Sequence, residues 1–211
     1  MVDEVIRKEL DELYVMSLPQ QTDFITKRLL EAGVQPSISN TAFTSNTSYE
    51  LGDYVLIDIN PVRFPERRTP CILDARDYEP LKGLFFRNEA RDTKIRGKYH
   101  KLPKITVSPV FIGNQKCSNV KVYRYILNAP KGVPVDHVFK SVVINTREAI
   151  VLSNTADNLK NRSCTRNLSE EQIKANKERD FSNTWFAYVY WRMLGLISQE
   201  DAFAYNLEKN S

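Results

Sequence analysis

Residues 54–59 read Tyr-Val-Leu-Ile-Asp-Ile, and this stretch decides the class of fold. It follows Gly52 and is rich in β-branched, aromatic and aliphatic residues, with Asp58 as its one charge. A short apolar run of this kind, placed after a turn residue, predicts a β-strand. The strand begins a long segment of similar character.

Similar short runs follow along the middle of the chain, with prolines and turn residues between them, and Asn145-Thr146 reads as a hairpin turn between the last two. This pattern predicts an antiparallel sheet, arranged as a sandwich or a small barrel. The run at 120–126 alternates, so Lys121, Tyr123 and Tyr125 should share one strand face. The expected strands are 71–73, 84–86, 105–108, 110–112, 120–126, 138–143 and 148–152.

Both ends of the chain have helical periodicity. Asp3 is suited to cap a helix that ends at Leu18-Pro19, and a second helix should begin at Thr22 or Asp23 and stop at Gly33. Near the other end, Ser169 with Gln172 three residues later forms a capping-box pattern. Ser198 should cap a final short helix. The prediction is an α+β protein whose antiparallel β-rich central domain is flanked by an N-terminal helical hairpin and C-terminal helices.

We therefore divide the chain into four segments. The N-terminal helical hairpin covers 1–33, and 34–50 is expected to be a long polar loop or arm because Ser, Thr and Asn dominate it. The basic β-rich domain covers 51–166 and the C-terminal helical segment covers 167–211. In the loop, Ile38, Ala42 and Phe43 are expected to dock on another surface.

Charge is distributed unevenly along the 211 residues. Residues 1–60 carry 4 basic and 10 acidic side chains, whereas residues 61–166 carry 21 basic and 9 acidic ones. Such asymmetry is typical of a chain that meets a polyanion or an acidic protein surface. No apolar signal core is present at the N-terminus, and the three cysteines lack metal-ligand spacing. We expect free thiols, no export through a signal peptide, no contact with a membrane, and a location in the cytoplasm or within an assembled particle.

The strongest concentration of charge is the run RDTKIRGKYHKLPK at 91–104. Basic side chains neutralise phosphates, and aromatic side chains beside them can stack on bases. The same charges could instead contact an acidic protein, including the acidic ends of a second copy, and a solvated loop is the simplest alternative. The residues expected to bind a polyanion or an acidic partner are Arg91, Lys94, Arg96, Lys98, Lys101, Lys104, Lys121, Tyr123 and Tyr125.

The stretch 185–197 is almost entirely apolar and rich in aromatic residues. A helix that is apolar all round is buried all round, so one side should meet the core and another could meet a second chain. Buried aromatic residues dominate interface energetics, and we expect Trp185, Tyr188 and Trp191 to anchor such an interface. The resulting hypothesis is a structural or adaptor subunit of a large assembly, of the viral or phage particle type.

No catalytic or nucleotide-binding motif is present, so the chain is expected to be no enzyme and to carry no cofactor and no metal. Of the two histidines, His100 is expected in a solvated loop and His137 at a strand edge beside Asp136. One alternative function is nucleic-acid binding through the basic β-rich domain. A second alternative is a metal-dependent nuclease, in which Asp58, Asp74 and Asp92 would hold a divalent ion.

Overall fold

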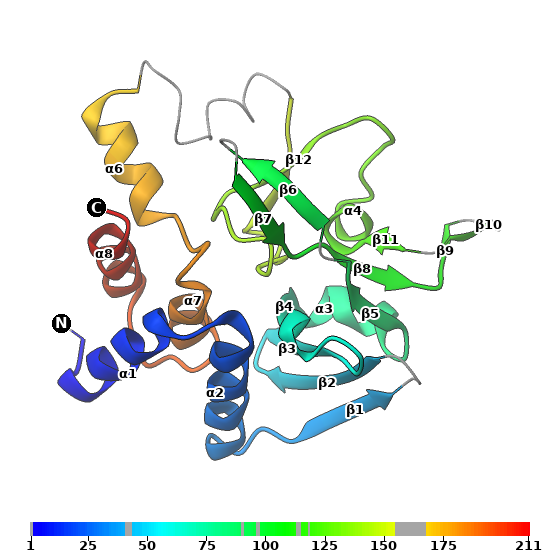
Figure 1. Cartoon of the computed structure of the whole chain (residues 1–211), viewed down its shortest axis with the longest axis horizontal. Coiled ribbons are helices and arrows are strands. Elements are labelled where there is room, and N and C mark those ends of the chain that lie inside the picture. Colours follow the sequence, from blue (N-terminus) through cyan, green and yellow to red (C-terminus); the bar gives the residue numbers. More distant parts are fainter. Residues whose placement is uncertain are drawn as a thin grey trace.

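The computed structural model describes residues 2–40, 44–89, 91–95, 98–112, 115–117, 119–154 and 168–211. Its centre is a four-stranded antiparallel sheet of order β1-β2-β3-β4 (Figure 1). The strand predicted at 54–59 is β3, and its residues Val55, Leu56, Ile57 and Ile59 are at most 1% exposed. The strands of this sheet are β1 Pro36–Asn40, β2 Thr44–Leu51, β3 Tyr54–Pro61 and β4 Thr69–Asp74.

The expectation of a long polar loop at 34–50 is wrong for the described part of that segment, because β1 and β2 form there. Polar side chains in this part of the sheet form hydrogen bonds to backbone carbonyls. The buried Asn46 donates from Nδ2 to the carbonyl of Phe86 at 3.2 Å, and Ser48 Oγ donates to the carbonyl of Ser37 at 3.3 Å. Ile38 is 63% exposed on β1, while Ala42 and Phe43 lie outside the described residues.

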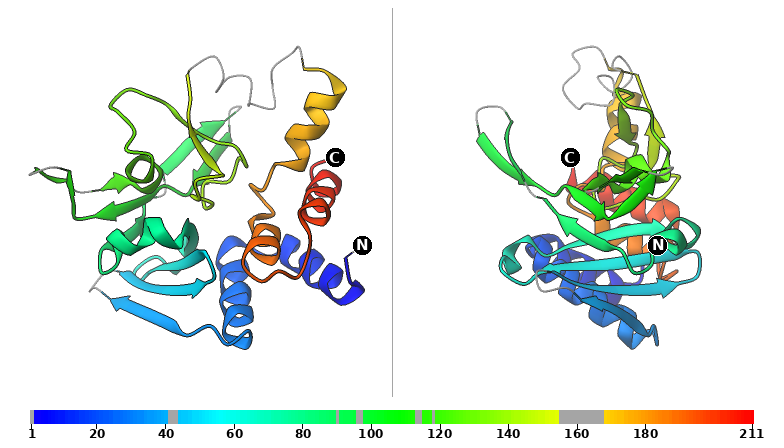
Figure 2. Two further views of the ribbon diagram at one scale, coloured as in Figure 1. Left: turned by 180° about the vertical axis from the view of Figure 1, so that it is seen from behind. Right: turned by 90° about the vertical axis from the view of Figure 1, so that its right-hand side faces the viewer.

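A second sheet is a meander of order β11-β8-β5, and two hairpins extend it. Hairpin β6–β7 is inserted between β5 and β8, and hairpin β9–β10 between β8 and β11. Both hairpins project from the body of the molecule in Figures 1 and 2. The strands are β5 Phe85–Asn88, β6 Arg91–Ile95, β7 Lys98–Leu102, β8 Ile105–Ser108, β9 Val110–Ile112, β10 Gln115–Cys117 and β11 Val120–Lys121.

The strand expected at 120–126 ends after two residues and continues as helix α4 (Val122–Ile126). A short alternating run is also compatible with a helix, and here Val122 and Ile126, four residues apart, are both buried. The Arg124 guanidinium stabilises the helix end by donating to the carbonyls of Ala129, Pro130 and Val133. Tyr123 and Tyr125 therefore do not share a strand face with Lys121.

The strand expected at 138–143 is also absent from the described structure. The hairpin consists instead of β12 (Val135–His137) and β13 (Ile150–Leu152), joined by the long connection 138–149. Part of this connection lies along the edge of β4, where Ile72 pairs with Ile144 in an isolated parallel bridge. Asn145-Thr146 is thus part of a loop fixed to the central sheet, not a tight turn.

The N-terminal helices pack against the central sheet and against the C-terminal helices. Helix α1 (Glu4–Val15) is capped by Asp3 as predicted, although Val5 is 65% exposed. Helix α2 (Leu18–Glu31) begins earlier than predicted, because Ser17 and Gln20 form a capping box and Pro19 fits the first turn. Gly33 follows the helix with a φ of 85°, which suits a glycine.

The C-terminal segment contains α6 (Glu170–Glu178), α7 (Trp185–Arg192) and α8 (Gln199–Lys209), with Ser169 and Ser198 as the predicted caps. Helix α7 is surrounded by aromatic rings, including Phe139 and Phe181 on neighbouring segments. One continuous hydrophobic cluster includes residues from both helical ends and from the middle strands. Short helices α3 (Ala75–Tyr78), η1 (Pro65–Arg67) and η2 (Glu79–Leu81) connect the strands.

The predicted α+β class is confirmed: antiparallel sheets occupy the middle of the chain, with helices from both ends beside them. In the part of the chain that the structure describes, every helix is too short or too polar to cross a membrane.

Candidate functional site

The basic run contains the two strands of a hairpin, β6 and β7, and not the loop that was the simplest alternative. The register places Arg91 opposite Leu102, Lys94 opposite Tyr99 and Asp92 opposite Lys101. Lys98 and Lys101 lie on β7 with His100 between them, while Arg96 lies outside the described residues. Lys104 follows β7 and forms an ion pair with Glu89 at 3.0 Å.

Lys121 and Tyr123 meet a residue that the sequence analysis did not place with them. The Lys121 ammonium lies 5.4 Å from the centre of the Tyr123 ring. The Tyr123 ring also contacts the His137 ring edge to face, with centroids 5.1 Å apart. The end of β11, the start of α4 and the end of β12 thus bring a cation, a phenol ring and an imidazole together.

The hydrogen bonds around His137 determine which of its ring nitrogens carries a proton. Its Nε2 lies 3.4 Å from Oδ1 of Asn145. The amide nitrogen of Asn145 donates to the carbonyl of Val142 at 3.1 Å and contacts the Cys71 sulfur at 3.7 Å, so the oxygen of the amide is the atom that faces the imidazole. Nε2 therefore donates, and Nδ1 of the neutral ring carries the lone pair.

The surroundings of His137 also favour its neutral form. Burial lowers the pKa of His137, and the positive charge of Lys121 acts in the same direction, while Asn145 and Asp136 oppose the shift. Among the described residues, Nε2 is the ring nitrogen of His137 with a hydrogen-bond partner. A neutral imidazole with a fixed tautomer and a lone pair on Nδ1 can accept a proton or bind a metal ion.

The connection that carries Asn145 is fixed at each of its next three residues. Thr146 Oγ1 lies 3.0 Å from the Tyr188 hydroxyl. Arg147 forms a two-point ion pair with Asp77, at 2.8 and 2.7 Å. Glu148 accepts from Tyr188 and from Arg192 on α7.

The Asn145 backbone is held as firmly, since its N–H donates to the Ile72 carbonyl at 2.8 Å. These bonds attach the partner of His137 to the central sheet and to the aromatic core. Preorganisation of this kind is what a catalytic or ligand-binding side chain requires.

Of this group, Lys121 also lines a surface groove of about 890 Å³, whereas Tyr123 and His137 are not among the described residues of its lining. Its charged lining consists of Lys121, Arg124, Arg147 and Asp77. Arg147 and Asp77 neutralise each other, so Lys121 and Arg124 leave the groove positively charged. Tyr125 also lines the groove, which places the predicted residues Lys121 and Tyr125 at one concave, positive surface.

Two of the carboxylates considered for a metal site, Asp58 and Asp74, are not brought together, and the side chain of Asp92 lies outside the described part of the structure. Asp58 binds Arg68 through both of its oxygens, at 2.9 and 2.8 Å. Asp74 pairs with Tyr54 in the ladder, four residue pairs from Asp58, which is about 13 Å along the strands. The described residues contain no cluster of three or more His, Cys, Asp or Glu side chains suited to a metal ion.

The three aromatic residues expected at an interface differ in exposure. Trp185 is 1% exposed and Tyr188 is 0% exposed, so both rings are enclosed by this chain. The indole of Trp185 donates to Gln21 Oε1 at 2.7 Å, and burial raises the pKa of Tyr188. Trp191 is half-buried, with the Arg192 guanidinium 4.0 Å from its ring centre. Enclosure by the chain's own core corrects the expectation for Trp185 and Tyr188 and leaves Trp191 as the candidate anchor.

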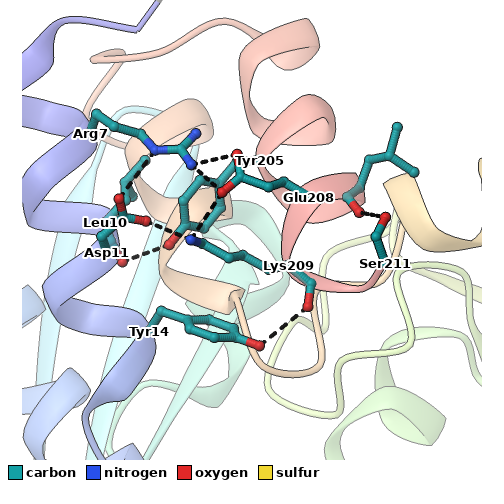
Figure 3. Close-up of polar contacts among 9 residues, drawn as sticks. Arg7, Leu10, Asp11, Tyr14, Tyr205, Glu208, Lys209 and Ser211 are labelled. Atoms are coloured by element: carbon teal, nitrogen blue, oxygen red, sulfur yellow. Dashed lines mark hydrogen bonds and ion pairs between the residues drawn. The ribbon is translucent and has the colours of Figure 1, made fainter.

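The densest charged cluster joins the two ends of the chain and is balanced (Figure 3). Arg7 on α1 pairs with Asp11 at 3.3 Å and with Glu208 on α8 at 2.5 Å, and Lys209 pairs with Asp11 at 2.8 Å. The Tyr205 hydroxyl below them donates to the Leu10 carbonyl at 2.7 Å. Two cations and two carboxylates leave no excess charge for a ligand, so this cluster attaches α8 to α1.

The pairing of His137 with Asn145 could not be found from the sequence. The two residues are eight positions apart, and the pattern assigned 138–143 to a strand and Asn145 itself to a turn. The available signals were the polar Asp136-His137 pair at a strand start and the Asn145 that follows.

Comparison of the chain with protein-family models, with curated proteins and with solved structures finds no match.

Proposed function

We propose that this protein binds nucleic acid and hydrolyses phosphodiester bonds, with His137 as the general base. The observation that carries the proposal is the contact of 3.4 Å between His137 Nε2 and the Asn145 amide oxygen: when Nε2 donates to this oxygen, Nδ1 is left able to take a proton. Lys121 adds a positive charge beside the ring, and the groove that it shares with Arg124 suits a phosphate backbone. The proposal departs from the expectation of a protein without catalysis, which stays untested.

The chemical step uses water as the nucleophile. Nδ1 of His137 takes a proton from a water molecule as its oxygen attacks phosphorus, a new P–O bond forms, and the bond to the leaving sugar oxygen breaks. The leaving oxygen takes a proton from solvent, and the imidazolium later returns its proton to solvent. Lys121 stabilises the negative charge that develops on the phosphoryl oxygens.

The test is cleavage of supercoiled plasmid and of labelled oligonucleotides, each with Mg²⁺, with Mn²⁺ and with EDTA. Replacing His137 by Gln keeps a hydrogen-bond donor for Asn145 but removes the base, and we expect a loss of about 100-fold or more in kcat. The Asn145→Ala variant keeps His137 but removes the hydrogen-bond partner of Nε2, and we expect a loss of kcat smaller than that of His137→Gln. Lys27→Gln, at an exposed position on α2, is the matched control and should cleave like the wild type.

The dependence of the cleavage rate on pH separates a catalytic role of His137 from a structural one. Activity should rise with pH through the lowered pKa of His137 and then level off, because the neutral ring is the active form. Cleavage by His137→Gln at the wild-type rate, or no cleavage by the wild type under any of the three conditions, would overturn the proposal. Equal unfolding temperatures of wild type and variant show that the fold is retained.

A structural or adaptor subunit of a large assembly is a second proposal, and one observation favours it. The half-buried Trp191 is followed by a surface where Leu196 is 40% exposed, so an aromatic ring and an aliphatic side chain are available to a partner subunit or a second copy. Size-exclusion chromatography with light scattering tests the case of a second copy. A larger species that Trp191→Ala converts to the monomer supports it, and a wild-type monomer at all concentrations contradicts it.

A further inference from the structure

Hairpin β6–β7 and the paired strands β5 and β8 form one continuous two-stranded ribbon. Asn88 pairs with Ile105, the Glu89 N–H donates to the Lys104 carbonyl at 2.8 Å, and the pairing resumes at Arg91 opposite Leu102. The five residue pairs of β6–β7 extend the ribbon by about 17 Å beyond the sheet. In the right-hand view of Figure 2 it stands clear of the rest of the molecule.

The base of the ribbon is fixed, so its direction is set by the fold. Asn88 donates from Nδ2 to the carbonyl of Arg67 at 2.9 Å and accepts at Oδ1 from the N–H of Lys104 at 3.1 Å. The ion pair between Lys104 and Glu89 lies at the same level. These contacts attach the base of the ribbon to the body of the molecule, and Lys104 is part of the attachment.

Apart from the Lys104–Glu89 pair at its base, the ribbon carries a large excess of positive charge. Residues 85–108 carry seven basic and two acidic side chains. The companion hairpin β9–β10 projects from the same meander, yet residues 109–119 contain Lys116 as their one charged side chain. Because the same topology supports an almost neutral hairpin, the positive charge of the first is better explained by a polyanionic partner than by folding.

We infer that the β6–β7 ribbon, whose strands carry Arg91, Lys94, Lys98 and Lys101, inserts into the major groove of B-form DNA and neutralises its phosphates. The major groove of B-DNA is about 12 Å wide and 8.5 Å deep, and it admits a two-stranded β-ribbon. The major groove of an A-form RNA duplex is too narrow and deep for this. The inference rests on the proposed function and adds to it the form of the nucleic acid.

Fluorescence anisotropy in EDTA tests the inference without turnover. The probes are a DNA duplex of about 20 base pairs, the RNA duplex of the same sequence and one single strand of the DNA. The variant replaces Lys94, Lys98 and Lys101 by Gln. The matched control replaces Lys8, Lys27 and Lys174, on three helices, and has the same net charge.

We expect the wild type to bind the DNA duplex at least tenfold more tightly than the RNA duplex. The ribbon variant should lower the slope of log affinity against log salt by about 2.7, which is three contacts at about 0.9 each. The control variant should keep the wild-type slope. Methyl green, which occupies the major groove, should displace the protein, whereas netropsin in the minor groove should not.

Unchanged DNA binding by the ribbon variant overturns the inference, and so does equal affinity for the RNA duplex or displacement by netropsin alone. The two proposals fail separately. If the wild type binds the DNA duplex but cleaves no substrate, the proposed hydrolysis fails and the inference about the ribbon remains. If the wild type cleaves DNA and the ribbon variant binds DNA as tightly as the wild type, the inference about the ribbon fails and the proposed hydrolysis remains.

Discussion

The aromatic helix α7 and the His137 site are joined by the same connection between β12 and β13, yet they use their polar groups in opposite ways. On α7, Trp185 donates to Gln21, Tyr188 donates to Glu148 and Tyr190 donates to Glu9. At His137, Asn145 contacts one ring nitrogen, and among the described residues the other ring nitrogen has no hydrogen-bond partner. Polar groups whose hydrogen bonds are all formed stabilise a core, whereas a ring nitrogen without a partner can accept a proton.

The largest effect should come from the core side of this comparison. Trp185→Ala removes an enclosed indole and leaves a cavity and an unpaired Gln21 oxygen, so the free energy of unfolding should fall by about 3–5 kcal/mol. Urea denaturation followed by circular dichroism measures it. Trp191→Ala on the same helix is the control and should lose clearly less, because that ring is half-buried. Equal losses would contradict the distinction between a core residue and a surface residue.

An intermediate effect should appear at His137 when the pH is lowered. Because its pKa in the folded protein lies below the usual value of about 6.5, the unfolded chain binds a proton that the native protein does not. The free energy of unfolding should therefore decrease as pH falls below about 6.5, by about 1.4 kcal/mol for each pH unit down to the folded pKa.

The free energy of unfolding of the wild type minus that of His137→Gln, measured by urea denaturation across this pH range, separates the contribution of His137 from that of His100. A difference that stays constant with pH would show that His137 is not held in its neutral form.

The smallest effect is expected at the ion network of Figure 3, which is paired like the core but exposed to solvent. Glu208→Gln removes one partner of Arg7, and because Glu208 is half exposed we expect a loss below about 1 kcal/mol. High salt should reduce the difference further. A loss comparable with that of Trp185→Ala would mean that charge pairing, and not aromatic packing, holds the two ends of the chain together.

The sequence determined the class of fold, the caps of three helices and the position of the central strand. These features depend on local patterns. Asp3, Ser169 and Ser198 form hydrogen bonds to their own helices, and the run 54–59 is apolar except for Asp58. Tertiary contacts decided the rest. Thr, Ser and Asn became strand residues in β2 because β1 and β3 pair with that strand, and 122–126 became helical because Val122 and Ile126 meet the core. The pairing of His137 with Asn145 depends on the edge of β4, which is distant in the sequence, so the local pattern around either residue could not predict it.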